Sequence, residues 1–393
     1  MACMKKAGRG QPGFVFSGPF EIPFLCSPFS ARAIIPVGYV PPPGHCRFPG
    51  SSMKTSDFEY ELPPDRIAQT PVEPRDHSRL LVLHRASGRI EHRRFWEIED
   101  YLEAGDVLVL NESRVIPARL LGEKRGGGAK VEILLLNRLD TGTWEALARP
   151  GKRLRKGSVI EIASADGKDR LIAEIRDKRA DGTVIVRLSE ESLIERMGTV
   201  PLPPYIHETL SDPERYQTVY ARNKGSVAAP TAGLHFTPAL LDRIRGKGIE
   251  IAFVTLHVGL GSFRPVKTED PAQHVLHNEF CEVSPDTARR LSLAKREGRR
   301  IVAVGTTAVR SIEKAAQLNG EVEAFRGWND LYILPGYRFR TVEALVTNFH
   351  LPRSTLLMLV CAFAGRDLTL GAYKEAVRKG YRFYSFGDAM LIL

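Results

Sequence analysis

The amino-acid sequence predicts a mixed α/β protein in which an antiparallel, β-barrel-like domain is inserted into an α/β domain. Short β-like runs follow one another through residues 73–204, and helix-like and strand-like segments alternate from about residue 215. Nine short strands separated by turns are typical of a barrel or a sandwich, and the alternation is typical of an α/β domain. We therefore expect residues 53–72 and 205–393 to form the α/β domain around an inserted domain at 73–204.

The first 52 residues differ in composition from the rest of the chain. They are rich in Pro and Gly, and Glu21 is their only acidic residue. This composition predicts a disordered extension, and it also fits upstream sequence ahead of a true start at Met53. A basic, acid-poor segment is alternatively typical of an organelle-targeting peptide, whereas the apolar stretch and cleavage site of a secretory signal are missing.

The predicted insertion consists of short runs separated by Gly- and Asp-containing turns such as "RGGGAK", "DTGT" and "ADGKD". Such punctuation indicates successive antiparallel strands. A Pro-rich stretch, "GTVPLPPYI", ends the block. The nine runs are "SRLLVLHR", "RIEHRRF", "DVLVLN", "RVIPARLLGE", "KVEILLLNRL", "TWEALAR", "SVIEIA", "RLIAEIRD" and "TVIVRLS".

The second half contains well-marked helix starts. Thr237 followed by Pro238, and Ser284 followed by Pro285, pair an N-cap residue with proline at the first helical position. "RRIVAVG" is a buried strand that precedes a helix, and "STLLMLVCAFAG" and "LGAYKEAVRKG" are further helices.

Composition limits the class of protein. Of 393 residues, 43% are hydrophobic and 26% charged, as in folded globular proteins, and the formal net charge is +10. No apolar run approaches the roughly 20 residues that a membrane-spanning helix needs. Only Cys281 and Cys361 follow residue 52, which excludes a disulfide framework there and suits a reducing cytoplasm.

The stretch "APTAGLHFTPALLDRI" places a loop with Thr231, Gly233 and His235 directly before a helix. Backbone N–H groups, a hydroxyl and an imidazole then gather at the positive end of the helix, which is typical of a site for an anion or a polar ligand. The same positive end should keep His235 neutral and able to accept a proton.

A second stretch, "TLHVGLGSFRPV", brings His257 to the end of a strand, followed by Gly259 and Gly261. Gly-X-Gly lets a ligand approach the backbone and resembles part of a dinucleotide fingerprint. Pro265 blocks the helix that this fingerprint requires, so we reject a Rossmann site. His257 fits equally well as a hydrogen-bonded histidine at a strand end.

Two further stretches carry polar groups after buried strands. In "VGTTAVRSIEK", Thr306, Thr307 and Arg310 are suited to receive a carboxylate or phosphate, with Thr307 as helix cap. The plain alternative is a capped helix with a surface arginine. In "TNFHLPRST", Asn348 and His350 lie between a strand and a helix.

The carboxyl terminus, "YRFYSFGDAMLIL", places Tyr384 and Asp388 around Gly387 among apolar residues. Asp388 is either a buried acid with a partner or the N-cap of a helix "AMLIL".

Other polar clusters carry weaker signals. "HVLHNE" joins His274, His277 and Glu279, but the spacing matches no metal motif, and we expect no metal site. Three basic stretches favour a polyanionic partner. The densest, "RPGKRLRKG", contains Lys152, Arg153, Arg155 and Lys156.

Taken together, these motifs resemble a known family. "NESRVIPARL", "GSVAAPTAGLHFT", "TLHVGLGSFRPV", "HVLHNEF", "VGTTAVRSIE", "LPGYRF", "VTNFHLPRSTLLMLVCAFAG" and "YRFYSFGDAMLIL" follow in the order and spacing of the S-adenosylmethionine:tRNA ribosyltransferase-isomerases of queuosine biosynthesis. The resemblance extends from Met53 to Leu393. "NESR" departs from the family's "NDTR" but keeps Arg114.

The resemblance implies that S-adenosylmethionine donates its ribosyl unit to the aminomethyl group of a deazaguanine base in the tRNA anticodon, releasing adenine and methionine and forming an epoxycyclopentanediol. It implies S-adenosylmethionine and tRNA as partners, no metal or other cofactor, and a cytoplasmic monomer. His235, His257 and Asp388 are the candidate catalytic residues. Lys152, Arg153, Arg155 and Lys156 are candidates for binding tRNA. Candidates for binding S-adenosylmethionine are Arg114, Thr231, Gly233, Gly259, Gly261, Thr306, Thr307, Arg310, Asn348, His350 and Tyr384.

Two other functional classes compete with this interpretation. A methyltransferase would release S-adenosylhomocysteine in place of adenine. A non-catalytic RNA-binding module would need cations and aromatic side chains, but not three loops that carry His235, His257 and His350.

Overall fold

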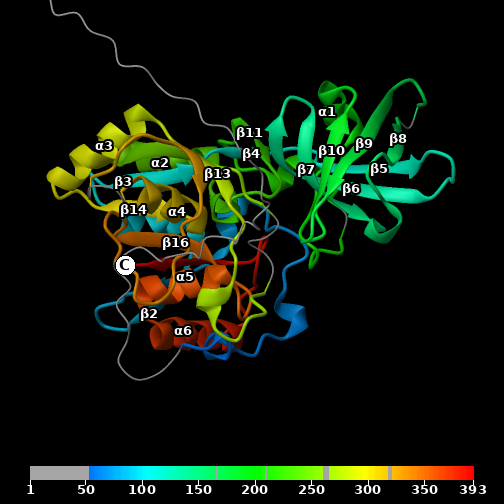
Figure 1. Ribbon diagram of the computed structural model, residues 1–393. Coiled ribbons are helices and arrows are strands. Elements are labelled where there is room, and N and C mark those ends of the chain that lie inside the picture. The colour runs from blue at the N-terminus through cyan, green and yellow to red at the C-terminus, as the bar shows by residue number, and fades with distance from the viewer. Residues whose placement is uncertain (1–52, 165, 209, 260–264, 317–320) are drawn as a thin grey trace, which may run out of the picture. The chain divides into compact units, whose positions relative to one another are not determined.

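The computed structural model describes residues 53–393 except 165, 209, 260–264 and 317–320. A nine-stranded mixed sheet forms its centre (Figure 1). The strand order is β15 (Phe325–Asn329), β13 (Glu279–Val283), β12 (Glu250–Leu256), β3 (Val107–Asn111), β14 (Ile301–Val304), β16 (Ala344–Asn348), β17 (Ala389–Ile392), β1 (Arg79–Leu83) and β2 (Ile90–Arg94).

Four neighbouring strands at the centre of this sheet, β12, β3, β14 and β16, are mutually parallel. Their carboxyl ends therefore meet at one end of the sheet and their amino ends at the other. In open α/β sheets, the carboxyl ends are the usual place for a ligand.

Helices cover both faces of the sheet, and each face has its own buried core. One core packs residues of α3, α4, α5 and α6 on the sheet, and the other packs α2 with a 3₁₀ helix, Phe95–Tyr101. The predicted caps are present, since Thr237 and Ser284 accept bonds from the backbone N–H groups of Leu240 and Thr287. The α-helices are α1 (Ile194–Met197), α2 (Pro238–Gly246), α3 (Pro285–Arg296), α4 (Thr306–Ala315), α5 (Thr355–Ala364) and α6 (Arg366–Arg378).

Six strands close into an antiparallel barrel around a separate apolar core (Figure 1). Their order is β10 (Val184–Leu188), β7 (Thr143–Arg149), β6 (Lys130–Asp140), β5 (Arg119–Lys124), β8 (Val159–Ala163) and β9 (Arg170–Lys178). A short parallel pair, β4 (Ser113–Val115) and β11 (Asn223–Ser226), lies just outside the barrel strands in sequence. The predicted fold class, an α/β sheet combined with an antiparallel barrel, is confirmed.

The predicted start of the barrel at residue 73 is wrong. The first three of the nine runs form β1, β2 and β3, which belong to the central sheet. The physical reason is visible in their composition: all of β3 and four of five residues in β1 are buried, because these strands are covered on both faces. Such strands are continuously apolar, whereas barrel strands alternate. "RLLVL" and "DVLVLN" carry that signal.

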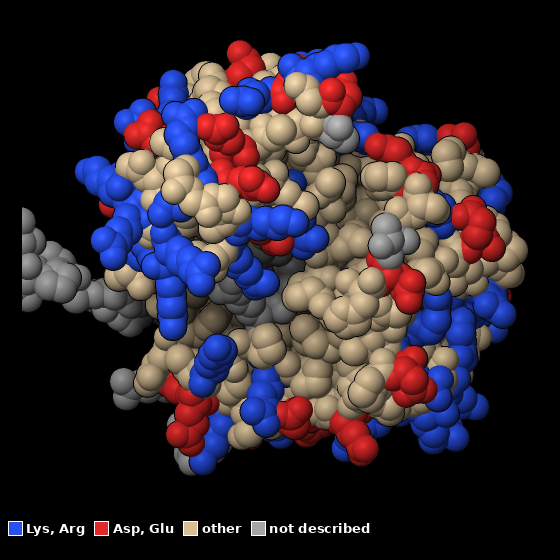
Figure 2. Space-filling model, turned by 90° about the vertical axis from the view of Figure 1, so that its right-hand side faces the viewer, with Lys and Arg blue, Asp and Glu red and all other residues tan. Residues whose placement is uncertain are grey.

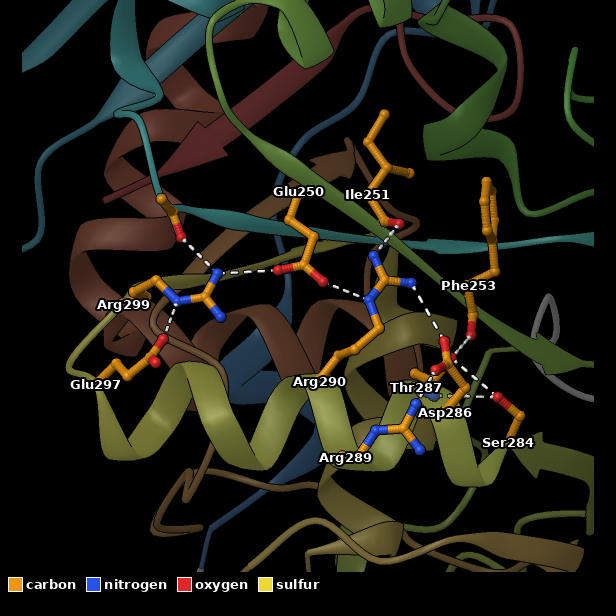
Figure 3. Close-up of polar contacts among 11 residues, drawn as sticks. Glu250, Ile251, Phe253, Ser284, Asp286, Thr287, Arg289, Arg290, Glu297 and Arg299 are labelled. Atoms are coloured by element: carbon orange, nitrogen blue, oxygen red, sulfur yellow. Dashed lines mark hydrogen bonds and ion pairs between the residues drawn. The ribbon is translucent and has the colours of Figure 1, made fainter.

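The amino ends of the parallel strands carry a network of ion pairs with α3 (Figure 3). Glu250, which begins β12, pairs with Arg290 and with Arg299, whose Nη1 lies 2.9 Å from Glu250 Oε2. Arg290 also donates to the carbonyl of Ile251, at 2.8 Å. Nearby, Arg300 pairs with the buried Asp106 at 2.6 Å.

Within the described residues, no single helix is long and apolar enough to cross a membrane. The only combination that passes on length and composition is α5 with α6, bent by 114° at the break between them.

Candidate active site

A pocket of about 630 Å³ lies at the carboxyl ends of the parallel strands. This volume includes space that is open to solvent. Its lining comes from segments that are distant in sequence: residues 229–232 before α2, 305–307 after β14, 347–351 at the end of β16 and beyond it, and a carboxyl-terminal turn at 384–385. Of the predicted ligand-binding residues, the pocket brings together Thr231, Thr306, Thr307, Asn348, His350 and Tyr384.

Asn348 links three of these segments. Its side-chain oxygen accepts a bond from Thr231 Oγ1 at 3.0 Å, and its Nδ2 donates to the carbonyl of Tyr384 at 3.2 Å. Nδ2 also lies 3.1 Å from His235 Nε2. Because Asn348 is 2% exposed, these bonds hold it in one orientation and fix the wall of the pocket.

His235 lies behind this wall. Its Nδ1 is 2.7 Å from Ser78 Oγ, its Nε2 faces Asn348, and its ring stacks on Phe95. Burial lowers the pKa of His235 to about 3, with smaller contributions from the charges of Arg382 and Arg75. The imidazole is therefore neutral, but the cause is burial rather than the helix end that the sequence indicated. Since both ring nitrogens are engaged, His235 is placed to orient Asn348.

Tyr384 occupies a left-handed backbone conformation, with φ of 69°. This conformation is unfavourable for a side chain with a Cβ atom and concentrates at functional sites. The turn is closed by Gly387, whose N–H donates to the carbonyl of Tyr384 at 3.0 Å. A Cβ atom on Gly387 would lie 2.5 Å from the carbonyl oxygen of Arg382, so only glycine fits this position.

The threonines after β14 do not cap α4, contrary to the prediction for Thr307. The helix begins at Thr306, and Gly305 takes the N-cap position with φ of 88° and no side-chain bond to the helix end. Thr307 Oγ1 accepts a bond from Asn111 Nδ2 at 3.2 Å. The helix therefore presents backbone N–H groups to the pocket, which suits a carboxylate.

His350 lines the pocket with one ring nitrogen engaged. Its Nε2 lies 2.8 Å from Thr347 Oγ1, and its carbonyl accepts from Tyr60 Oη at 2.5 Å. Burial lowers the pKa of His350 to about 3, so the imidazole is neutral at pH 7. Among the described residues, Nδ1 of His350 has no hydrogen-bond partner.

Arg310 does not belong to the pocket. It is 4% exposed, forms a buried ion pair with Glu279 and donates from Nε to the carbonyl of Leu331 at 3.0 Å. The expectation that Arg310 receives a ligand carboxylate is wrong in this structure, because its guanidinium is committed to protein groups. Neither of the two interpretations, a ligand-binding arginine or a surface arginine, predicted that Arg310 would be buried.

Three other predicted site residues have structural partners away from the pocket lining. Arg114 pairs with Glu214. Gly233 packs so closely that a Cβ atom would lie 2.0 Å from Tyr220 Oη. Asp388 is a buried acid with partners, which was one of the two predicted alternatives. Its carboxylate accepts bonds from the backbone N–H groups of Arg79 and Arg382, each at 2.8 Å.

The alternative that Asp388 caps a helix is wrong, since the following residues form strand β17. Burial raises the pKa of Asp388, against the opposing effect of these two backbone bonds. Its position ties the start of β1 to the carboxyl-terminal turn.

His257 lies directly after β12 and does not line the pocket, although its neighbour Val258 does. Burial lowers its pKa to about 4, its Nδ1 is 3.4 Å from Ser113 Oγ, and its ring stacks on Phe280. Gly259 donates its N–H to Glu279 Oε1 at 2.8 Å. Gly261 lies outside the described residues.

The cationic turn of the barrel is exposed to solvent. Lys152 and Arg153 belong to the 3₁₀ helix Gly151–Arg153, and Arg155 and Lys156 follow it. None of these four side chains forms an ion pair in the part of the chain that the structure describes. Figure 2 shows the barrel side of the molecule, where Lys and Arg side chains gather in several groups.

Two hydroxyl-bearing pocket residues, Tyr205 and Ser385, are among those that the sequence did not predict. Their hydroxyl oxygens lie 2.8 Å apart. The rings of Tyr205 and Tyr384 are 4.7 Å apart. A signal for Tyr205 was present, because it is the one aromatic residue in the Pro-rich stretch after the barrel.

No group of three or more His, Cys, Asp or Glu side chains suited to a metal occurs within residues 53–393, the masked positions aside. In the stretch considered for a metal, Glu279 is engaged with Arg310.

Comparison with known proteins assigns this chain to a family. A family model described as "Queuosine biosynthesis protein" matches residues 55–392. The chain belongs to this family. Curated relatives named S-adenosylmethionine:tRNA ribosyltransferase-isomerase include those of Desulfitobacterium hafniense, 55% identical over 345 residues, and Moorella thermoacetica, 56% identical over 346 residues. Each match covers 87% of this chain and 100% of the relative.

A solved relative supports the same family assignment. The crystal structure of S-adenosylmethionine tRNA ribosyltransferase from Thermotoga maritima is 47% identical, with a TM-score of 0.51, and the match covers 86% of this chain and 100% of the solved one. The queuosine biosynthesis family therefore spans both the sheet and the barrel of this protein.

Proposed function

We propose that this protein is an S-adenosylmethionine:tRNA ribosyltransferase-isomerase. It transfers the ribosyl unit of S-adenosylmethionine to the aminomethyl deazaguanine base of the tRNA anticodon and isomerises it to an epoxycyclopentanediol, with release of adenine and methionine. The observation that carries the proposal is the full-length match to relatives of that name. The pocket at the carboxyl ends of the parallel strands supports it with its place in the sheet and its polar and aromatic lining.

The lining suits the three parts of S-adenosylmethionine. Tyr205 and Tyr384 offer aromatic faces to adenine. The first N–H groups of α4, at Thr306 and Thr307, suit the methionine carboxylate. Thr231 and Asn348 offer hydroxyl and amide groups to the ribose.

Proton transfer requires a neutral base near the reacting carbon next to the sulfonium. The sulfonium acidifies that C–H bond, and a neutral imidazole accepts its proton at pH 7. His350 fits this role better than His235, because it lines the pocket and its Nδ1 is unengaged among the described residues. His235 acts as a positioning residue through Asn348.

The anticodon loop is single-stranded, and its recognition requires cations and aromatic platforms. The turn with Lys152, Arg153, Arg155 and Lys156 supplies unpaired cations. An aromatic row that starts at His257 and runs through Phe280 to Trp328 crosses β12, β13 and the edge strand β15. Trp328 is 45% exposed, so the row ends at a surface on which an unpaired base can stack.

The proposal includes the remaining expectations for the whole enzyme. We expect a cytoplasmic monomer that needs no metal and no cofactor beyond S-adenosylmethionine as co-substrate. We also expect the barrel strands Arg119–Leu188 to form the inserted domain. Sedimentation in the absence of RNA and turnover in the presence of a chelator check the oligomeric state and the metal independence.

The products of the reaction test the activity. The protein is incubated with S-adenosylmethionine and tRNA that bears the aminomethyl deazaguanine, and the small molecules and digested tRNA are separated by mass. Adenine and methionine should appear in equal amounts, and the tRNA should gain the cyclopentanediol unit. S-adenosylhomocysteine with methylated tRNA would identify a methyltransferase, and tRNA binding without adenine release would identify an RNA-binding module.

A further inference from the structure

A second, smaller pocket of about 280 Å³ adjoins the first. Ser385 lines both pockets, and His235, which supports the wall of the first, lines the second. Three arginines, Arg75, Arg215 and Arg382, contribute to its lining. The roles proposed for the first pocket and for the barrel turn do not involve these arginines.

Carboxylates neutralise the charge of these arginines only in part. Only Arg215 forms an ion pair, with Glu73 at 2.6 Å, and the Glu73 side chain is 72% exposed. Within the described residues, neither Arg75 nor Arg382 has a carboxylate oxygen within 4 Å of its guanidinium. Burial lowers the pKa of Arg75 and repulsion by Arg215 contributes, against the opposing charges of Glu73, Asp212 and Glu214.

Backbone carbonyls hold the guanidinium groups in place. Arg75 donates to the carbonyls of Gln217 and Glu214 at 2.5 and 3.0 Å. Arg382 donates to those of Thr70 and Phe386 at 3.1 and 3.0 Å. A guanidinium has five N–H donors, so each arginine retains donors for a ligand after these bonds.

These features are those of a preformed site for an oxyanion. A rigid, partly buried group of arginines favours carboxylate and phosphate, because such anions accept paired N–H bonds. We propose that the pocket formed by Arg75, Arg215 and Arg382 binds an oxyanion of a substrate beside the active site. This inference rests on the proposed function, which supplies two such groups: a phosphodiester of the anticodon loop and the carboxylate of S-adenosylmethionine.

The same chain contains a matched control. Arg85 donates to the carbonyls of Leu393, Phe363 and Glu343. Burial lowers the pKa of Arg85, as it does for Arg75, but Arg85 lies in neither pocket. If carbonyl bonding were the whole role of such arginines, Arg382→Gln and Arg85→Gln would behave alike.

Inorganic phosphate is the first probe, because its binding requires no turnover. Melting temperatures are measured with increasing phosphate at constant ionic strength, and each variant is compared with itself without phosphate. Wild type and Arg85→Gln should be stabilised by phosphate, and Arg382→Gln should lose most of the shift. Arg382→Lys, which keeps the charge, should retain part of it. Equal shifts in wild type and Arg382→Gln would overturn the proposal.

The second arm separates the two sources of the anion. Binding of an anticodon stem-loop and of S-adenosylmethionine is measured for the same variants. Loss of one charge-assisted contact should weaken one ligand by about 10- to 100-fold. Weaker RNA binding assigns the pocket to a phosphodiester, and weaker S-adenosylmethionine binding assigns it to the methionine carboxylate in place of the first turn of α4.

Affinities for both ligands that match those of Arg85→Gln would contradict the inference. Failure of the proposed function is distinguishable, because wild type would then release no adenine whatever the phosphate response.

Discussion

The two ends of the same four parallel strands differ in chemistry. At the amino ends stand Asp106, Glu250 and Arg300, which pair with each other or with charges of α3 and its flank. Figure 3 shows the pairs of Glu250. At the carboxyl ends stand Asn111 and Asn348, uncharged and bonded to hydroxyl, amide and carbonyl groups. The 630 Å³ pocket lies at the carboxyl ends.

The difference separates stability from function. Charges at the amino ends neutralise each other, so they leave no electrostatic demand for a ligand. Polar groups at the carboxyl ends are oriented without being neutralised by counter-ions, and they line a hollow in which a cationic sulfonium and a carboxylate can be accommodated. Substitutions at the two ends should therefore fail in different ways.

The largest effect is expected from Asn348→Ala at the carboxyl end. The change removes the bonds to Thr231, His235 and Tyr384. We expect turnover to fall by about 10²–10⁴, the range for loss of an organised acid–base site, with a stability loss of about 1–3 kcal/mol for the unpaired groups. Adenine release and the melting temperature are the two measurements.

Asn329→Ala is the matched control for this prediction. Asn329 is also fully buried and bonds the backbone of Arg310 and Leu331, each at 3.0 Å, but lies outside the pocket. It should lose comparable stability and keep its turnover at low temperature. Equal turnover in the two variants would remove Asn348 from the site.

The next effect concerns tRNA binding by the barrel turn, which should change independently of S-adenosylmethionine binding at the central sheet. Changing Lys152, Arg153, Arg155 and Lys156 to Ala should weaken tRNA binding and flatten its dependence on salt, because up to four phosphate contacts are lost. S-adenosylmethionine affinity should stay constant. A salt dependence identical to that of wild type would show that this turn is an ordinary solvated hairpin.

The third effect is a pH dependence set by His235. Its pKa is about 3 in the folded protein and about 6.5 in an unfolded chain. Between these values the unfolded chain binds more protons than the folded one. The contribution of His235 to the free energy of unfolding is therefore fully present above about pH 6.5 and is lost as the pH drops toward 3. The slope is about 1.4 kcal/mol per pH unit for one such histidine.

Denaturant unfolding of wild type and His235→Gln from pH 7.5 to 4.5 checks this prediction. The wild-type curve should fall more steeply than the variant curve below pH 6.5. Parallel curves would mean that the pKa of His235 is the same in the folded and the unfolded chain, which would contradict its burial as a neutral, positioning imidazole.

The smallest effect is expected from Glu250→Gln at the amino end. Bonds from Arg299 and Arg290 outweigh burial and hold the pKa of Glu250 below its ordinary value. The ion pairs therefore stabilise the protein above the unfolded pKa of about 4.3, and this contribution is lost as the pH falls through the lower folded value. We expect a loss of about 0.5–1.5 kcal/mol at pH 7 with unchanged turnover. A drop in turnover without a drop in melting temperature would contradict the separation of the two ends.

Much of the fold could be predicted from local patterns. Thr237–Pro238 and Ser284–Pro285 begin helices where the capping rule indicates. The barrel boundary could not be placed, because strand partners are set by long-range pairing: β1 pairs with β17, some 300 residues later. The apolar continuity of β1 and β3 was the local signal that these strands are covered on both faces.

The candidate site was predictable in part for a similar reason. Polar residues that directly follow buried strands, such as Thr306 and Asn348, converge because parallel strands share a carboxyl end. Arg310 was misplaced, because a sequence does not reveal that Glu279, at the start of β13, pairs with this residue of α4. Tyr205 was missed, because its approach to Tyr384 depends on how the chain returns from the barrel.

The location of bound S-adenosylmethionine tests the central claim most directly. A crystal structure of the protein with S-adenosylmethionine, in the absence of tRNA, would reveal it. The ligand should lie at the carboxyl ends of the parallel strands, in contact with Thr231, Asn348 and the first turn of α4, with its sulfonium-bearing carbons near His350. A ligand bound elsewhere, with these residues untouched, would contradict the account.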